Sequence, residues 1–302
     1  MDFKSKIILI YGPTASGKSE FAIKLAKKIK GEIVNADSMQ IYKDLKILTA
    51  RPLRKNFQTI KHHLYGFQKS NKHFSTGDWL KLAIKQINQI RERKKIPILV
   101  GGTGLYFKAL TEGLVEIPSI PLKFRNKIRK LQKDIGQDEF YEKLLKIDPN
   151  SLSYINPSDA QRSIRAYEVK KFTKKSITDW YKATKSNFKN RDFYKIIINQ
   201  SRPELIKKIN VRTKQMIESG AILEVKKFLK LRISKEKSIS KAIGLSEIRD
   251  YIKKLIDKEE VIDKISIKTR QYAKRQATWA RGHMPSWKKI EPKRLNNFLK
   301  KI

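Results

Sequence analysis

The sequence contains no cysteine, few acidic residues and no long apolar run. The absence of cysteine excludes disulfide bonds and metal sites built on thiolates. The apolar stretches are far shorter than the ~20 residues needed to cross a bilayer. A core strand is predicted within a few residues of Met1, which leaves no room for a secretory signal. We therefore expect a cytoplasmic protein that does not associate with membranes.

Acidic residues are also scarce relative to basic ones. Against 69 lysines and arginines stand 29 aspartates and glutamates, giving a formal net charge of +40. An excess of this size favours a polyanionic partner such as a nucleic acid. Lysine, isoleucine and asparagine are abundant throughout, so biased composition and a solvated surface also account for part of the excess. The length of 302 residues allows one large or two modest domains, and we expect two.

A phosphate-binding loop of the form G-x-x-x-x-G-K-[ST] lies near the start of the chain. It consists of Gly12, Pro13, Thr14, Ala15, Ser16, Gly17, Lys18 and Ser19. In such a loop backbone N–H groups and a helix N-terminus hold phosphate oxygens, the lysine adds positive charge, and the final hydroxyl is offered to Mg²⁺. The apolar residues 6–11 before it are typical of a buried parallel strand, and residues 20–26 have helical spacing. The loop predicts a bound di- or triphosphate without selecting one.

Strand and helix patterns alternate over residues 6–112. Strands are predicted at 7–11, 32–36 and 96–100, and a helix at 77–94. This alternation predicts an α/β fold with a parallel sheet covered by helices, as in P-loop NTPases. Ligands of such sheets bind outside the carboxyl ends of the strands. We therefore expect the phosphate loop, Asp37-Ser38 and Gly101–Gly104 to meet in one crevice.

The pattern changes between residues 120 and 185, where lysine-rich helical stretches are separated by prolines and no buried strand is evident. A core strand returns at 194–199, and residues 202–281 are predicted to be largely helical. We therefore divide the chain into a P-loop core, residues 1–118 and 190–302, and a helical insertion domain, residues 119–189. The core includes a helical C-terminal segment.

Seven motifs, in order along almost the whole chain, resemble the tRNA dimethylallyltransferase family. They are Gly12–Ser19, Asp37–Tyr42, His62–Leu64, Val100–Tyr106, Asp159–Arg162, Lys241–Gly244 and Thr269–Trp279. The resemblance implies transfer of a dimethylallyl group from dimethylallyl diphosphate to N6 of the adenosine 3′ of the anticodon. The partners would be that diphosphate and a tRNA anticodon stem-loop, with Mg²⁺ as cofactor at Ser19. We expect a monomer whose phosphate loop holds the isoprenoid diphosphate.

Four catalytic residues follow from this resemblance. Lys18 and the loop N–H groups would neutralise the departing diphosphate, and Thr14 would lie near its bridging oxygen. Arg212 matches a family arginine that points at the diphosphate. Asp37 would accept the N6 proton as the general base. From the residues alone, an equally good interpretation is that Asp37 caps the following turn, as Asp-Ser pairs often do.

The target base must be extruded from the anticodon loop before it can react. The resemblance assigns the tRNA contacts to Asp37, Ser38, Met39, Gln40, Thr103, Arg125, Gln161, Arg162, Ser163, Ile164, Arg165, Lys241, Ala242, Ile243, Gly244, Leu245, Ser246, Lys274, Arg275, Gln276, Trp279 and Arg281. Two alternatives remain open. Residues 161–165 are also typical of an ordinary helix surface, and Gly244 of a helix stop.

The C-terminal segment carries a basic helical face. Arg270, Lys274, Thr278 and Arg281 recur at intervals of three and four residues. Such a face suits the phosphates and unstacked bases of RNA. Tyr272 and Trp279 lie elsewhere around the predicted helix, and we expect them in the core.

Two positions depart from the family pattern. Leu48 stands where the family generally has glycine, so we expect a different backbone there, which affects the contact of Thr49. Lys208 stands where arginine is common and loses the bidentate fork. Two other functions stay open: a small-molecule or nucleotide kinase, which would consume ATP, and a non-catalytic RNA-binding protein, which would leave the phosphate loop idle.

Overall fold

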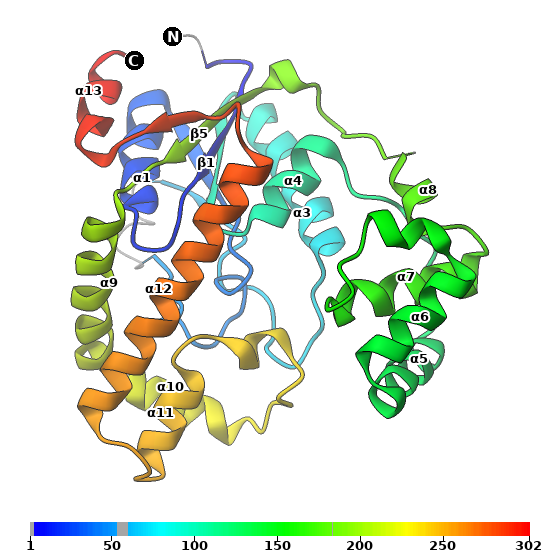
Figure 1. Cartoon of the computed structure of the whole chain (residues 1–302). Helices are drawn as coiled ribbons and strands as arrows, with labels where there is room; N and C mark the ends of the chain where they lie inside the picture. Colours follow the sequence, from blue (N-terminus) through cyan, green and yellow to red (C-terminus); the bar gives the residue numbers. More distant parts are fainter. Residues whose placement is uncertain (1–2, 53–59, 183) are drawn as a thin grey trace. The chain divides into compact units, whose positions relative to one another are not determined.

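A computed structural model describes residues 3–52, 60–182 and 184–302. It divides the chain into two compact units (Figure 1). The core unit consists of Met1–Thr111 and Phe188–Ile302, and the helical unit of Glu112–Asn187. Among the described residues, no helix combines the length and the apolar character needed to span a membrane.

The core unit is built on six parallel strands in the order β3-β2-β4-β1-β5-β6. The strands are β1 Ile7–Tyr11, β2 Gly31–Asn35, β3 His62–His63, β4 Ile96–Gly101, β5 Phe193–Ile198 and β6 Lys288–Ile290. The central strands β1, β2 and β4 are buried along their whole length, as expected for a parallel sheet covered on both faces. The predicted α/β fold is confirmed. Strands β3 and β6 are too short to produce a periodic signal in the sequence.

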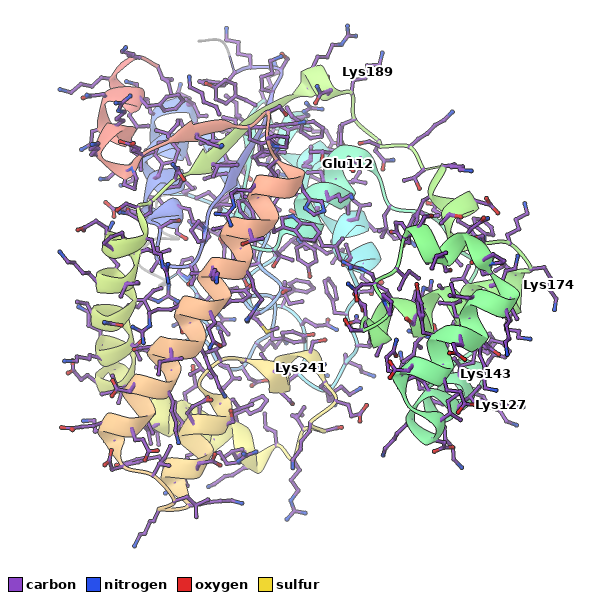
Figure 2. The ribbon with its side chains drawn as sticks, in the orientation of Figure 1. Glu112, Lys127, Lys143, Lys174, Lys189 and Lys241 are labelled. Atoms are coloured by element: carbon purple, nitrogen blue, oxygen red, sulfur yellow. The ribbon has the colours of Figure 1, made fainter. Side chains whose placement is uncertain are left out.

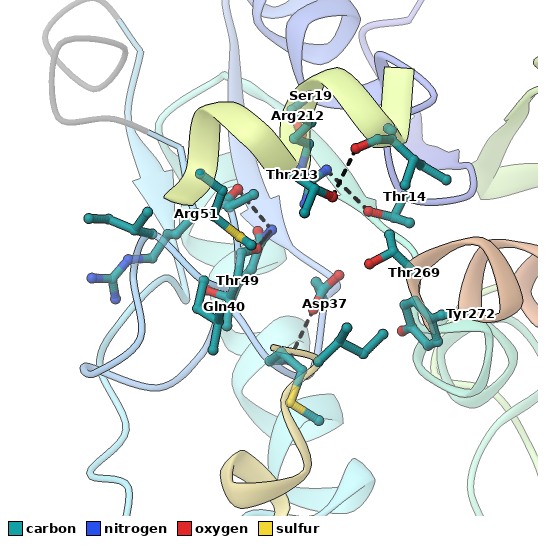
Figure 3. A pocket seen from close by; sticks show the side chains of 18 of the residues that line it. Thr14, Ser19, Asp37, Gln40, Thr49, Arg51, Arg212, Thr213, Thr269 and Tyr272 are labelled. Atoms are coloured by element: carbon teal, nitrogen blue, oxygen red, sulfur yellow. Dashed lines mark hydrogen bonds between the residues drawn. The ribbon is translucent and has the colours of Figure 1, made fainter. Parts of the chain in front are cut away.

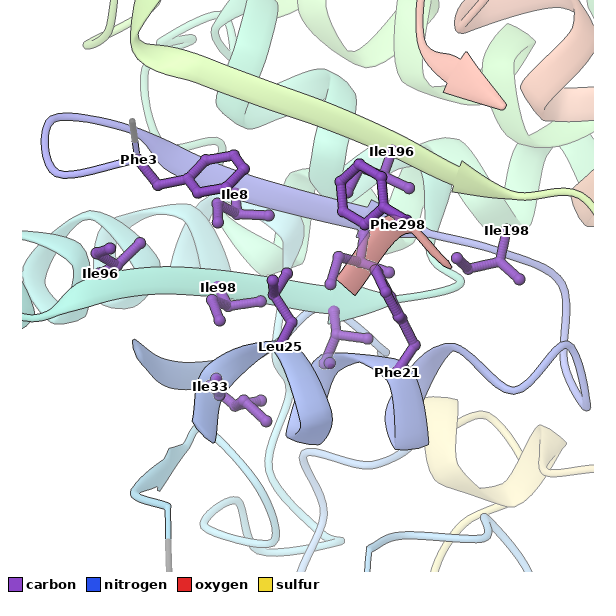
Figure 4. Close-up of a cluster of buried hydrophobic side chains, with 14 of the residues drawn as sticks. Phe3, Ile8, Phe21, Leu25, Ile33, Ile96, Ile98, Ile196, Ile198 and Phe298 are labelled. Atoms are coloured by element: carbon purple, nitrogen blue, oxygen red, sulfur yellow. The ribbon is translucent and has the colours of Figure 1, made fainter. Parts of the chain in front are cut away.

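Helices cover both faces of this sheet. On one face α1, Lys18–Ile29, packs Phe21 and Leu25 against strand residues such as Ile98, and Phe298 of α13, Leu295–Lys300, joins the same cluster (Figure 4). Side chains alternate between the faces of a strand, so Tyr11 points to the other one. There its ring meets Phe107 of α4, Gly104–Glu112, edge to face. Helix α3, Thr76–Glu92, contacts β2 and β4.

Four α-helices lie between residues 202 and 283. They are α9 Arg202–Met216, α10 Ile222–Lys230, α11 Leu245–Ile252 and α12 Lys258–His283. A π-helical turn at Ile217–Ala221 joins α9 to α10, and Gly220 breaks the helical backbone there with a φ of 99°. Helices α9 and α12 pack side by side beside the sheet (Figure 1). The helical prediction for residues 202–281 therefore holds, with interruptions.

The helical unit contains α5 Leu122–Ile135, α6 Gln137–Ile147, α7 Ala160–Thr173 and α8 Ile177–Lys182. Tyr141, Leu144 and Val169 belong to its small apolar core. No strand occurs in the described part of this unit, in agreement with the sequence pattern. Lys127 and Lys174 are exposed on its surface (Figure 2), so part of the excess positive charge is solvated.

Candidate active site

A cavity of about 940 Å³ opens where the carboxyl ends of β1 and β2 meet the C-terminal helices (Figure 3). Its lining includes Thr14–Ser19 from the phosphate loop and Asp37 from the segment after β2. Arg212 of α9 and Tyr272 of α12 complete it from the other side. The loop and Asp37 therefore converge as predicted. The Gly101–Gly104 segment lies beside this cavity and not in its lining.

The phosphate loop connects β1 to α1 and turns tightly. The Ser16 N–H donates to the Pro13 carbonyl at 3.2 Å, and Ala15 adopts a left-handed φ of 63°. The buried Ser16 hydroxyl has no hydrogen-bond partner among the described residues. The first N–H groups of α1 also lack helical acceptors, as at any helix N-terminus. The loop thus presents unused donors to the cavity, as an anion-binding loop should.

Among the cations that line the cavity, Lys18 and Arg212 form no ion pair with any described carboxylate. The Lys18 Nζ donates to the Pro13 carbonyl at 3.1 Å, and the Arg212 Nη1 donates to the Thr14 hydroxyl at 3.1 Å. Burial lowers the pKa of Lys18 to about 8, although the nearby Asp37 charge opposes this shift. Burial likewise lowers the pKa of Arg212, and Asp37 again opposes it. A bound anion would relieve this uncompensated positive charge.

Asp37 is fixed by Asn35, the last residue of β2. The Asp37 N–H donates to Asn35 Oδ1 at 2.9 Å, and Asn35 Nδ2 donates to the Asp37 carbonyl at 3.0 Å. Within the side chain of Asp37 the two oxygens differ. Oδ1 accepts the Met39 N–H at 2.9 Å, while Oδ2 has no hydrogen bond to a described residue. One oxygen therefore caps the turn, and the other is available to accept a proton.

The prediction that Tyr272 and Trp279 belong to the core holds only in part, since both side chains are partly buried. Tyr272 lines the cavity together with Thr269, and the Arg275 guanidinium lies 5.7 Å from the centre of its ring. Burial raises the pKa of Tyr272, so its phenol stays neutral. Trp279 stacks on His283 with 3.9 Å between ring centres. Ile265, Thr269 and Tyr272 all line the cavity. Their intervals of four and three residues place them on one face of α12, and this spacing was the sequence signal that could have grouped them.

Some of the tRNA contacts predicted within the core unit line the cavity, and others lie beside it. Those that line it are Asp37, Met39, Gln40, Lys241, Ala242, Ile243 and Arg275. The Gln40 amide donates to the carbonyls of Thr49 and Ala50. Ser38 and Thr103 lie beside the cavity, where the Ser38 N–H donates to the Thr103 hydroxyl at 2.9 Å. All of these roles remain predictions.

Residues 244–246 begin α11, so the interpretation of Gly244 as a helix stop is wrong. The Gly244 N–H donates to Glu247 at 3.0 Å, Leu245 is buried, and the Ser246 hydroxyl donates to Glu247. On α12 the side chains of Lys274 and Arg281 are exposed. Their positions suit contact with a large anion.

The remaining predicted contacts lie in the helical unit. Arg125 and Arg165 both reach the buried carboxylate of Glu168. Arg162 is exposed and pairs with Asp159 at the start of α7. Ser163 is buried, and its hydroxyl donates to the Asp159 carbonyl. The other two positions differ from it: Gln161 is exposed and Ile164 partly so.

The two departures from the family pattern lie on the cavity wall. Leu48 does not adopt a left-handed backbone, and its N–H donates to Glu224 Oε2 at 2.9 Å. The Thr49 hydroxyl donates to the Leu45 carbonyl at 2.7 Å. Lys208 donates to the Gln200 side chain at 3.1 Å. Glu224, which also accepts the Ile47 N–H, thus holds the loop that carries Leu48.

The fold and the cavity define the class of this protein. A parallel sheet, a phosphate loop that enters a helix and the unpaired cations Lys18 and Arg212 make it an α/β P-loop protein whose cavity has the charge and the donors that suit an anionic ligand. The loop alone is shared by many such proteins, so the ligand has to be decided by the rest of the chain.

Comparisons with known proteins narrow this class. The family model for IPP transferase matches residues 40–283. The chain is 59% identical over 302 residues to the tRNA dimethylallyltransferase of Pelagibacter ubique (strain HTCC1062), covering 100% of this chain and 96% of the relative. It is 43% identical to that of Rhizobium etli (strain ATCC 51251 / DSM 11541 / JCM 21823 / NBRC 15573 / CFN 42), covering 94% of this chain and 96% of the relative.

Solved structures agree. A tRNA delta(2)-isopentenylpyrophosphate transferase from Staphylococcus epidermidis is 32% identical, with a TM-score of 0.69, covering 98% of this chain and 96% of that one. A eukaryotic dimethylallyltransferase acting on tRNA is 28% identical, with a TM-score of 0.82, covering 95% of this chain and 73% of that one. The chain therefore belongs to the tRNA dimethylallyltransferase family, which consists of transferases. The family predicted from the sequence is confirmed.

Proposed function

We propose that this protein transfers the dimethylallyl group of dimethylallyl diphosphate to N6 of the adenosine directly 3′ of the anticodon in tRNA. The observation that carries the proposal is the meeting of three features in one cavity of a chain of this family. They are the phosphate loop, the unpaired cations Lys18 and Arg212, and a carboxylate oxygen of Asp37 without a partner among the described residues.

The departing diphosphate is the main source of the barrier. As N6 attacks the allylic C1, the C1–O bond breaks and its electron pair passes to the diphosphate oxygen. Lys18, Arg212 and the N–H groups of the loop are placed to stabilise this charge. A single preorganised donor of this kind is worth about 3–4 kcal/mol. The Thr14 hydroxyl would lie near the bridging oxygen of the diphosphate, because it lines the cavity next to Arg212.

Proton removal completes the transfer. Adenine N6 is a weak nucleophile until it loses a proton, and the free oxygen of Asp37 would accept that proton. General-base assistance contributes roughly 10²–10⁴-fold. Because Oδ1 stays bonded to the Met39 N–H, Oδ2 is held in a fixed direction.

The residues present fit a magnesium ion bound with the diphosphate. The Ser19 hydroxyl lines the cavity and makes no hydrogen bond to a described residue. In the described ranges no group of three or more histidines, aspartates or glutamates is arranged to hold a metal ion. Ser19 and diphosphate oxygens would therefore share Mg²⁺, which prefers few protein ligands together with phosphate and water. When bound, the ion supplies further positive charge against the leaving group.

The tRNA would lie against the exposed basic face of α12. Lys274, Thr278 and Arg281 are exposed there, and Arg275 and Tyr272 of the same helix line the cavity. An extruded base could thus reach Asp37 while its backbone contacts the helix. We assign the exposed predicted contacts of the helical unit, Gln161 and Arg162, to the same RNA.

Nucleoside analysis after reaction tests the proposal. The protein is incubated with an anticodon stem-loop RNA, Mg²⁺ and either labelled dimethylallyl diphosphate or labelled ATP. We expect dimethylallyl adenosine at one position and no label from ATP. Phosphate transfer from ATP would indicate a kinase instead. RNA binding without any transfer would indicate a non-catalytic protein.

A further inference from the structure

The side chain of Gln276 joins three segments that are distant in the sequence. Only 5% of it is exposed, although it belongs to the basic helix α12. Its Oε1 accepts the Thr14 N–H at 2.8 Å, and its Nε2 donates to the Gly102 carbonyl at 2.8 Å. The backbone carbonyl of Gln276 accepts a hydrogen bond from the Tyr11 hydroxyl at 2.8 Å. Every polar group of the side chain is therefore engaged inside the protein.

The glycines after β4 make room for this contact. A Cβ on Gly102 would come within 2.1 Å of the Gln276 Nε2. A Cβ on Gly104 would come within 2.0 Å of the Trp279 Nε1, one turn further along α12. A side chain at either glycine would therefore force the Gln276 amide or the Trp279 ring to shift. The glycine-rich segment thus packs against α12. It contacts this helix and does not face the cavity.

Thr14 is held from two sides. Its N–H is turned to Gln276, and its hydroxyl accepts from the Arg212 Nη1. The N–H is consequently not available to a phosphate, and the hydroxyl has a fixed position at the cavity. No other described group accepts the Thr14 N–H, so loss of Gln276 would leave a half-buried donor without a partner.

We propose that Gln276 is a positioning residue that fixes Thr14, and with it the diphosphate loop, from the RNA-facing helix. It acts through Thr14 and does not contact the tRNA as the sequence predicts. This inference rests on the proposed function and assigns a role within the same site. One face of α12 then presents cations to the RNA while the opposite face sets the shape of the diphosphate loop.

Binding of inorganic pyrophosphate to the full-length protein tests the role. Gln276→Met keeps the side-chain size and removes both amide bonds, so we expect the pyrophosphate Kd to rise about tenfold. The affinity for a stem-loop RNA should stay within about twofold. Gln271→Met, at an exposed position of the same helix, is the matched control and should leave pyrophosphate binding unchanged. Weaker RNA binding with unchanged pyrophosphate binding would overturn the proposal and make Gln276 a tRNA contact.

A double-mutant cycle identifies the route. Gly102→Ala displaces the Gln276 amide, so it should weaken pyrophosphate binding by itself and add nothing to Gln276→Met. Fully additive effects would contradict the shared contact. Hydrogen exchange in the wild-type protein gives a measurement that needs no variant to fold. The Thr14 amide should be protected in the free protein, and rapid exchange there would overturn the proposal.

Pyrophosphate binding requires neither the prenyl donor nor turnover. Failure of prenyl transfer would therefore leave this test intact, and failure of this test would leave prenyl transfer intact. In a kinetic assay Gln276→Met should lower kcat with little change in the KM for RNA.

Discussion

In the core unit, Lys18 and Arg212 face the cavity without an ion-pair partner among the described residues, whereas three arginines of the helical unit surround the buried carboxylate of Glu168. Those arginines are Arg125 at 3.2 Å, Arg129 at 3.8 Å and Arg165 at 3.4 Å. The same charge types thus occur in two settings. Where a carboxylate compensates them they hold helices together, and where it is missing they cost stability and favour the binding of an anion, as proposed for the diphosphate.

Substitution of Asp37, the proposed general base, should have the largest effect on prenyl transfer. Asp37→Asn keeps the oxygen that accepts the Met39 N–H but cannot take up the N6 proton. We expect kcat for prenyl transfer to fall roughly 10²–10⁴-fold with RNA binding retained. Asp44→Asn, outside the cavity lining, is the control. Near-normal turnover would remove Asp37 from the mechanism.

Removing the charge of Lys18 should have the second largest effect on prenyl transfer. Lys18→Met should lower kcat/KM by roughly 10²–10³-fold, about 3–4 kcal/mol of lost stabilisation of the leaving group. The melting temperature should stay equal or rise, because a desolvated cation is lost. Lys27→Met, at an exposed position of the same helix, should change neither. A large fall in Tm together with the loss of activity would show that Lys18 is structural after all.

Reversing charge on α12 extends the comparison to the surface. Lys274→Glu with Arg281→Glu should weaken stem-loop binding roughly tenfold or more at low salt and flatten its salt dependence. Titrations at several salt concentrations measure both. Lys27→Glu with Lys30→Glu changes net charge equally on another exposed helix end. Equal losses in the two pairs would mean that only net charge matters.

A pH titration sharpens the assignment of Lys18. Its pKa is lowered to about 8, so it is protonated below this pH and loses its charge as pH rises through it. Pyrophosphate binding needs the charged form, and its affinity should fall by up to about tenfold per pH unit above 8. Calorimetry from pH 7 to 9.5 would follow this decline. The Lys18→Met protein should lack it, and an identical profile in both proteins would contradict the assignment.

Breaking the compensated cluster should affect stability alone. Glu168→Gln removes the charge that holds the three arginines and should destabilise the helical unit by about 1–2 kcal/mol, since the arginines are partly exposed. Hydrogen exchange in α5 and α7 would report the loss. Pyrophosphate affinity should not change. The opposite pattern, normal protection with weaker pyrophosphate binding, would erase the distinction between the two sites.

Local sequence signals were sufficient for much of the fold. The apolar runs at 7–11 and 96–100 became central strands, because a strand buried on both faces needs a continuous apolar run. The phosphate loop and Asp37 could also be located, since each follows a strand and the carboxyl ends of parallel strands share one edge. The short strand β6 and the interruption at Gly220 left no comparable pattern.

The sequence by itself determined the sheet, the loop, the carboxylate and, through ordered motifs, the family. Only the tertiary structure decided which face of α12 looks inward. Tyr272 lines the cavity and Gln276 bonds to Thr14 across 262 positions of the chain. Helical spacing shows that residues share a face, but what that face meets depends on packing between distant segments. For the same reason only the structure could separate the unpaired cations of the cavity from the arginines already paired with Glu168.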